Sequence, residues 1–122
     1  MTNYFMVAGS RHWDLDPGIV LDTMLVHCDG GETMLDGACP TGLDPIAYKI
    51  WTEIFGFPSQ RFPADWQQFG KRAAFLRDMQ MIGKRPKFLL AFPLSGEENK
   101  GTKLAIKLAR DADIRVIEVP GG

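Results

Sequence analysis

Apolar and polar positions along this 122-residue chain follow two alternating patterns. Short continuous apolar runs are typical of buried strands, whereas apolar residues at every third or fourth position are typical of helices. The runs predict strands at 4–8, 33–35, 59–62, 87–92 and 115–119, and the periodic stretches predict helices beginning at 17, 45, 70 and 102. This alternation predicts an α/β fold with a mostly parallel sheet of about five strands, covered by helices on both faces.

Local signals predict where the helices start and which faces they bury. Asp16-Pro17 and Asp44-Pro45 each place an aspartate N-cap before a proline at the first helical position. Helical spacing gives the second helix an apolar face of Ile46, Ala47, Ile50, Trp51 and Ile54. The third helix, 70–82, is expected to turn inward Phe75, Met79 and Ile82. The last helix, 102–111, is expected to bury a stripe of Leu104, Ala105, Leu108 and Ala109.

The composition is that of an ordinary globular protein and narrows the function classes. A length of 122 residues suits one domain, 1–122, and a formal net charge of −1 disfavours nucleic-acid binding. Cys28 and Cys39 form neither a disulfide framework nor a metal-ligand spacing, so we expect a reducing compartment and no metal or other cofactor. The predicted location is the cytoplasm, that of the host if a phage encodes the chain. No apolar run approaches the ~20 residues of a membrane span, and no membrane partner is expected.

The loops that follow the predicted strands are the expected ligand sites. Ligands of parallel sheets bind at the carboxyl ends of the strands, near a topological switch point. The loops cover 9–14, 37–44, 63–71 and 93–102, and each contains glycine, which lets backbone N–H groups approach a ligand closely. Ser10 and Arg11 add a hydroxyl and a guanidinium that suit a phosphate or carboxylate. The chain has neither G-x-G-x-x-G after the first strand nor G-x-x-x-x-G-K-[ST], so the standard nucleotide fingerprints are absent.

A basic turn follows the third predicted strand. Gly70 opens the predicted helix there, and Lys71 and Arg72 occupy its first turn, where a helix itself prefers acidic residues. An anionic ligand is one explanation, because helix N-termini favour anions. A solvated basic turn is the other. With a ligand, we expect Lys71 and Arg77 to contact an anionic group.

Several aromatic, acidic and thiol side chains in the loops after the predicted strands can each be interpreted in two ways. Trp13 and Trp66 either stack on a base or pack as hydrophobic plugs. Asp44 and Asp65 either hydrogen-bond ribose hydroxyls or cap helices. Cys39 is either a nucleophile or a small residue in a tight turn, and the lack of a nearby histidine in the sequence favours the turn.

Several sequence blocks occur in order along nearly the whole chain. They are Val7-Ala8-Gly9-Ser10-Arg11, Gly37-Ala38-Cys39-Pro40-Thr41-Gly42-Leu43-Asp44, Phe62-Pro63-Ala64-Asp65-Trp66 with Gly70-Lys71, Arg77-Asp78 with Met81, and Leu90-Ala91-Phe92-Pro93 with Gly101-Thr102. In this order they resemble the YspA-related branch of the SLOG superfamily, which groups SMF/DprA proteins with LOG-type "lysine decarboxylase-like" proteins. Small members of this branch are common in bacteria and their phages. The resemblance implies a Rossmann-like, three-layer αβα fold that binds a nucleotide or a nucleotide-derived ligand.

The resemblance also points to candidate residues. The expected ligand-binding residues are Gly9, Ser10, Arg11, Gly37, Gly42, Asp44, Asp65, Trp66, Gly70, Lys71, Arg77, Gly101 and Thr102. LOG-type phosphoribohydrolases carry P-G-G-x-G-T-x-x-E, in which the glycines cradle phosphate and the glutamate takes part in cleaving the N-glycosidic bond. Here the loop 93–102 lacks the double glycine, and Ala105 stands at the glutamate position, where it offers no acid or base. The family asparagine after Arg77 is Asp78.

Two functions from different classes remain. The first is a sensor or sequestering module that binds a nucleoside monophosphate or an ADP-ribose-like compound at the carboxyl edge of the sheet. The alternative is a hydrolase of the N-glycosidic bond in such a compound, with Glu97 or Glu98 as the catalytic carboxylate. DNA binding by analogy with the SMF/DprA members is disfavoured by the near-neutral charge. The expected partners are a nucleotide-derived small molecule and further copies of the chain, in a homodimer or a higher homo-oligomer.

Overall fold

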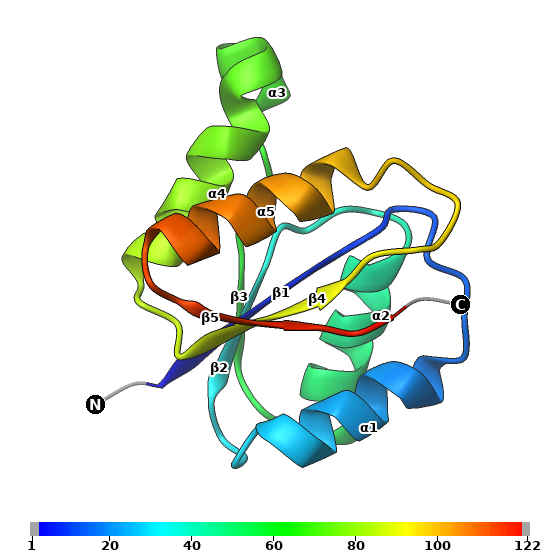
Figure 1. The fold of residues 1–122 in the computed structure, drawn as a ribbon. Coiled ribbons are helices and arrows are strands. Elements are labelled where there is room, and N and C mark those ends of the chain that lie inside the picture. The colour runs from blue at the N-terminus through cyan, green and yellow to red at the C-terminus, as the bar shows by residue number, and fades with distance from the viewer. Residues whose placement is uncertain (1–2, 121–122) are drawn as a thin grey trace.

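The computed structural model describes residues 3–120 and contains one sheet of five strands, all of whose pairings are parallel (Figure 1). In chain order the strands are β1 (Tyr4–Gly9), β2 (Thr33–Asp36), β3 (Ser59–Arg61), β4 (Phe88–Phe92) and β5 (Arg115–Glu118). They lie in the spatial order β3-β2-β1-β4-β5. The predicted α/β, Rossmann-like fold is confirmed. The first and last two residues of the predicted domain, 1–2 and 121–122, lie outside the described residues.

Helices cover both faces of the sheet. They are α1 (Pro17–His27), α2 (Leu43–Lys49) with its continuation η1 (Ile50–Ile54), α3 (Trp66–Phe69), η2 (Gly70–Arg72), α4 (Ala73–Gly83) and α5 (Lys100–Asp111). One face is covered by α1 and α2 and the opposite face by α4 and α5, while α3 stands beyond the sheet at the start of α4 (Figure 1). None of the helices within residues 3–120 combines the length and apolar character needed to cross a membrane.

The core forms two apolar layers because successive residues of a strand point to opposite faces of the sheet. Phe5 and Val7 of β1 pack in the layer under α1 and α2, whereas Met6 packs in the layer under α4 and α5. Trp51 is buried in the first layer, as predicted, and its Nε1 donates hydrogen bonds to the carbonyls of Glu32 (3.0 Å) and Pro58 (3.1 Å).

The first aspartate–proline pair begins a helix as predicted, but the second does not. Asp16 caps α1 by accepting a hydrogen bond from the N–H of Gly18 at 2.9 Å. In contrast, α2 begins at Leu43, with Gly42 as its N-cap and Asp44 already inside the first turn. Gly42 adopts φ +79° and packs against the backbone of the β1–α1 loop, so the turn into α2 closes earlier than the proline suggests.

The predicted apolar face of the second helix is right except at its end. Ala47, Ile50 and Trp51 are buried, but Ile54 is 59% exposed. The segment Ile50–Ile54 is a π-helical turn, in which hydrogen bonds span five residues. The wider turn changes the angular position of each residue, and Ile54 consequently leaves the face that 3.6-residue spacing predicts.

The prediction of one helix from Gly70 to Ile82 is wrong. Asp65 caps the short helix α3 by accepting from the N–H of Gln68 at 3.0 Å, and α4 begins only at Ala73. Gly70 has φ +56° and separates the two helices, and a 3₁₀ turn follows it. Lys71 therefore lies between helical segments and not at a free helix N-terminus.

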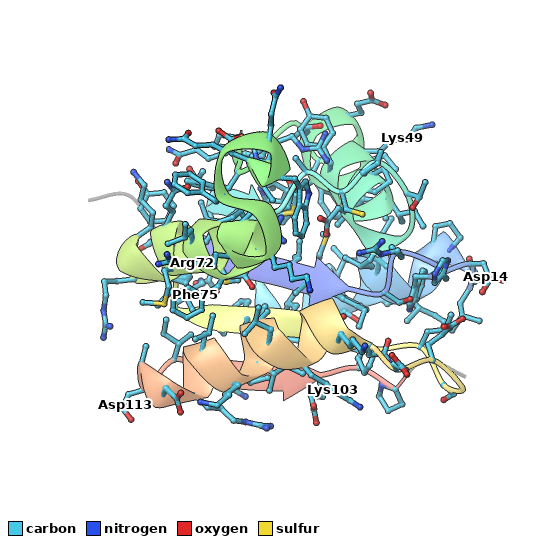
Figure 2. The ribbon with its side chains drawn as sticks, turned by 90° about the horizontal axis from the view of Figure 1, so that it is seen from above. Asp14, Lys49, Arg72, Phe75, Lys103 and Asp113 are labelled. Atoms are coloured by element: carbon cyan, nitrogen blue, oxygen red, sulfur yellow. The ribbon has the colours of Figure 1, made fainter. Side chains whose placement is uncertain are left out.

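The buried face of α4 also differs from the prediction. Ile82 is buried as expected, but Phe75 and Met79 are 42% and 43% exposed. The side chains of Arg72 and Phe75 are visible along this helical segment in the view from above (Figure 2). The face that packs on the sheet carries Ala73, Asp78, Met81 and Ile82. A search for the most apolar stripe misses this face because one of its positions holds an aspartate.

Candidate functional site

A cavity of about 420 Å³ lies at the carboxyl edge of the sheet. Its walls come from the end of β1, the β1–α1, β2–α2 and β4–α5 loops, the first turn of α2, and the facing sides of α4 and α5. From β1 the chain turns towards β2, and from β4 it turns the opposite way towards β5, so the cavity opens at the topological switch point. Its volume falls within the usual 300–1,000 Å³ range of small-molecule sites.

The cavity brings together most of the residues predicted from sequence. Those that line it are Gly9, Ser10, Arg11, Gly37, Asp44, Arg77, Glu97, Glu98, Gly101 and Thr102. Those that do not line it are Gly42, Asp65, Trp66, Gly70 and Lys71. Further lining residues, absent from the predicted ligand set, include His12, Cys39, Asp78, Asn99, Lys100 and Ala105. The sequence could have indicated Asp78 as a site residue, because it is a charged residue in the middle of an otherwise apolar helix face.

The β1–α1 loop forms one wall. Ser10 is 6% exposed, its N–H donates to the Phe92 carbonyl at 3.1 Å, and its Oγ accepts from the N–H of His12 at 3.0 Å. A Cβ on Gly9 would lie 2.5 Å from Cγ of Leu43, so glycine is required where α2 packs against the strand end. Arg11 is exposed and lines the cavity.

The two tryptophans with open interpretations have different surroundings, and neither lines the cavity. Trp13 is 3% exposed and packs edge-on against Phe92, with ring centroids 6.0 Å apart, so it is a hydrophobic plug. Trp66 is 55% exposed and does not line the cavity. The acid that precedes it, Asp65, serves as the cap of α3.

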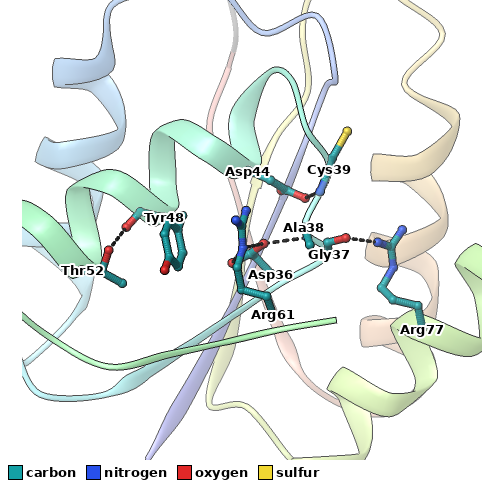
Figure 3. A network of polar contacts seen from close by, with 9 residues as sticks. All are labelled: Asp36, Gly37, Ala38, Cys39, Asp44, Tyr48, Thr52, Arg61 and Arg77. Carbon is teal, nitrogen blue, oxygen red and sulfur yellow. Dashed lines mark hydrogen bonds and ion pairs between the residues drawn. The ribbon is translucent and has the colours of Figure 1, made fainter. Parts of the chain in front are cut away.

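Arg77 is fixed at the cavity wall by two contacts. Its Nη1 donates to the Gly37 carbonyl at 2.7 Å (Figure 3). Its Nε lies 2.8 Å from Oδ1 of Asp78 as an ion pair. A Cβ at position 37 would collide with the guanidinium, so glycine there admits the arginine. The arginine thus links α4 to the β2–α2 loop, and only its remaining N–H groups are free of these contacts.

The β2–α2 loop is organised by two buried carboxylates. Asp36 accepts from the N–H of Ala38 (2.7 Å) and from Nε of Arg61 (3.1 Å), while Oδ2 of Asp44 accepts from the N–H of Cys39 (3.0 Å), as Figure 3 shows. Asp44 therefore holds the loop and does not cap α2. Burial, with the nearby charge of Asp36, raises the pKa of Asp44 to about 6. Burial likewise raises the pKa of Asp36, against the opposing hydrogen bond from Ala38 and the charge of Arg61.

Asp78 supplies a further buried carboxylate at the cavity wall. It is 4% exposed, and burial raises its pKa to about 6 although the charge of Arg77 acts in the opposite direction. Two cavity carboxyl groups with pKa values close to neutrality can each accept or donate a hydrogen bond near physiological pH. Such groups are typical of binding and catalytic sites.

The N-terminus of α5 faces the same cavity. The helix has 12 residues, and its N-cap, Asn99, adopts φ 55° without providing a side-chain cap. The Asn99 amide instead braces the preceding loop, because its Oδ1 accepts from Leu94 N–H (3.0 Å) and its Nδ2 donates to the Leu94 and Glu97 carbonyls (2.9 and 3.0 Å). Thr102 in the first turn is 3% exposed, and its Oγ1 has no hydrogen-bond partner among the described residues.

Ala105 lies on the buried face of α5, as predicted, and also lines the cavity. The predicted resemblance to LOG-type enzymes would place a glutamate here, and the chain instead presents a methyl group. Glu97 and Glu98 line the cavity from the loop before α5 and are both exposed. Within residues 3–120, no cluster of three or more histidine, cysteine, aspartate or glutamate side chains could hold a metal ion.

Comparison with known proteins finds no matching family model, no curated protein and no solved structure of significant similarity. The resemblance to the YspA-related branch therefore stays a prediction.

Proposed function

We propose that this protein binds a nucleotide or nucleotide-derived ligand, such as a nucleoside monophosphate or ADP-ribose, as a sensor or sequestering module. The observation that carries the proposal is the N-terminus of α5. It opens on the cavity without a side-chain cap and places the unpartnered Oγ1 of Thr102 beside it. Helix N-termini offer free N–H groups and a partial positive charge, which suit a phosphate.

Polar groups around this terminus suit the rest of such a ligand. Arg11 and Lys100 supply positive charge from the two loops that flank the switch point, and Ser10 supplies a hydroxyl. Asp44 presents a buried carboxyl group that suits the hydroxyls of a ribose. Cations and a buried carboxyl group within one cavity suit a ligand that joins an anionic group to a sugar.

The test measures binding of ADP-ribose, AMP and ribose 5-phosphate by isothermal titration calorimetry. Thr102→Val keeps the shape of the side chain and removes its hydroxyl. It should weaken binding about tenfold or more, because a hydrogen bond to a charged group contributes about 1.5–3 kcal/mol. Lys71→Ala is the matched control, since this cation does not line the cavity and its loss should leave affinity unchanged. A larger loss with Lys71→Ala than with Thr102→Val would place the anion elsewhere.

Hydrolysis of an N-glycosidic bond is the second candidate function. It is favoured by one observation, which is that Glu97 and Glu98 line the cavity together with Asp44 and Asp78. A carboxylate near the ribose could stabilise developing positive charge or activate water. Ala105 favours binding without turnover, because it leaves the family's glutamate position empty of an acid.

Turnover is tested by chromatography of nucleoside monophosphates and ADP-ribose after long incubation with the protein. A binding module releases neither free base nor ribose phosphate. Product that disappears in the Glu97→Gln/Glu98→Gln double variant would establish the hydrolase and assign its acid to this loop.

A further inference from the structure

Asp78 is a buried carboxylate with few partners of its own. A carboxylate offers about four acceptor positions. Asp78 makes a single polar contact, the ion pair with Nε of Arg77 at 2.8 Å, as far as the described part of the chain is concerned. The side chain nevertheless lines the cavity while only 5% of it is exposed.

Glu32 shows how the same fold treats a carboxylate with a structural role. It is 3% exposed at the opposite edge of the sheet, accepts from the N–H groups of Asp29 (2.8 Å) and Gly30 (2.6 Å), and pairs with Nζ of Lys87 at 2.7 Å. Burial alone would raise the pKa of Glu32, but these hydrogen bonds outweigh it and lower the pKa below the ordinary value. For Asp78, burial dominates and the pKa is raised. The carboxylate at the cavity therefore retains acceptor capacity that the protein does not fill.

The groups around Asp78 leave its unfilled acceptor positions facing the cavity. Arg77 is already engaged by the Gly37 carbonyl and by Asp78 itself. On the facing helix, Thr102 and Ala105 line the same cavity, and the methyl group of Ala105 offers no donor. A donor on a ligand in the cavity can therefore fill these acceptor positions without a change in the fold.

We propose that Asp78 is a specificity-determining residue that accepts a hydrogen bond from a donor group of the ligand, such as a sugar hydroxyl, beside the anion held at α5. This inference rests on the proposed function. It selects phosphorylated sugars and their nucleotides over anions that lack a hydroxyl or amino group at that position. Inorganic phosphate, which can occupy the α5 terminus alone, gains nothing from Asp78.

Other charged groups around the cavity bear on the pH dependence of binding. The charge that acts on Asp78 from its own helix is Arg77, and β1 contributes only uncharged lining residues. The other elements around the cavity add further titratable or charged residues to its lining. Arg11 and His12 come from the β1–α1 loop, Cys39 and Asp44 from the β2–α2 loop and the first turn of α2, and Glu97, Glu98 and Lys100 from the α5 side. Asp44 has a pKa of about 6 as well, so the effect of Asp78 must be isolated as a difference between two proteins.

The experiment compares ADP-ribose affinity for the wild type and Asp78→Asn at about pH 8 and pH 5, by isothermal titration calorimetry. ADP-ribose is the probe because its pyrophosphate keeps a constant charge over this range, whereas a phosphate monoester titrates near pH 6. The asparagine side chain is nearly isosteric with aspartate and does not ionise. We expect the variant to bind about tenfold more weakly than the wild type at pH 8 and about equally at pH 5, where a group of pKa about 6 is only about one-tenth ionised. Any change of affinity common to both proteins on acidification arises from the other titratable groups of the cavity, Asp44 among them.

Several results would overturn the inference. An equal ratio of the two affinities at both pH values shows that Asp78 has only a structural role. Tighter binding by Asp78→Asn at pH 8 shows that the carboxylate merely offsets the charge of Arg77. If the asparagine variant does not fold, Asp78→Ser is compared in the same way. Failure of wild-type protein to bind any of ADP-ribose, AMP and ribose 5-phosphate at pH 8 overturns the proposed function, and this inference with it.

Discussion

Asp78 contributes more to the stability of the ligand-free protein in mild acid than at pH 8. The folded-state pKa is about 6, above the ordinary value of 3.8, because the carboxylate is buried and its ionised form is disfavoured. The folded protein therefore binds the proton more tightly than the unfolded chain does. Stability from this group is present below the unfolded pKa and is lost as pH rises through about 6.

The size of the effect follows from these two pKa values. Between pH 8 and pH 5 the linkage relation gives wild type a gain of about 1.4 kcal/mol in the free energy of unfolding from Asp78 alone. Asp78→Asn lacks this titration. The folded-state pKa of about 6 already includes the attraction between Arg77 and the ionised carboxylate. The pH-dependent part of the ion pair is therefore counted in the value of about 1.4 kcal/mol and needs no separate addition. We therefore expect the difference in stability between the two proteins to change by about 1.4 kcal/mol over this range.

Urea denaturation at pH 8 and pH 5, followed by tryptophan fluorescence and circular dichroism, measures the four free energies of unfolding. Coincidence of the two optical transitions checks that unfolding is two-state. A stability difference between Asp78→Asn and wild type that is the same at pH 8 and pH 5 would refute the reasoning, because it would mean that Asp78 titrates alike in the folded and unfolded states. A change of the opposite sign would mean that Arg77 lowers the pKa more than burial raises it.

Three further predictions concern the loops and the core. Gly37→Ala should lower the stability measured by urea denaturation by about 1–3 kcal/mol, because its Cβ displaces the guanidinium of Arg77 from the Gly37 carbonyl and from buried Asp78; an unchanged midpoint would show that the arginine keeps both contacts. Gly42→Ala should destabilise the fold by more than about 1 kcal/mol in urea denaturation, since its Cβ meets rigid backbone and its φ is +79°; an unchanged midpoint would contradict this. Trp51→Phe should cost about 1–3 kcal/mol of stability, because the carbonyls of buried Glu32 and of Pro58 lose the indole donor, and a loss well below 1 kcal/mol would show that water replaces it.

The sequence alone determined the alternation of strands and helices. The signals for it are local: continuous apolar runs for strands buried on both faces, and the Asp16-Pro17 pair for the start of α1. Parallel pairing then followed from the connections, since each strand is joined to the next through a helix. The position of the cavity at the strand ends was predictable for the same reason, and ten of the expected site residues, the two glutamates included, line it.

Only the tertiary structure decided which charged residues share the cavity. Asp44 resembles a helix cap in the sequence, yet the close packing of Gly42 on the β1–α1 loop starts α2 earlier and turns Asp44 towards the Cys39 amide. Lys71 resembles a helix N-terminal cation, yet the break at Gly70 takes it away from any free terminus. These outcomes depend on contacts between segments far apart in the chain. A local pattern gives the spacing of residues along an element but not the depth to which tertiary packing buries each one, and for Asp44 and Asp78 that depth sets the pKa.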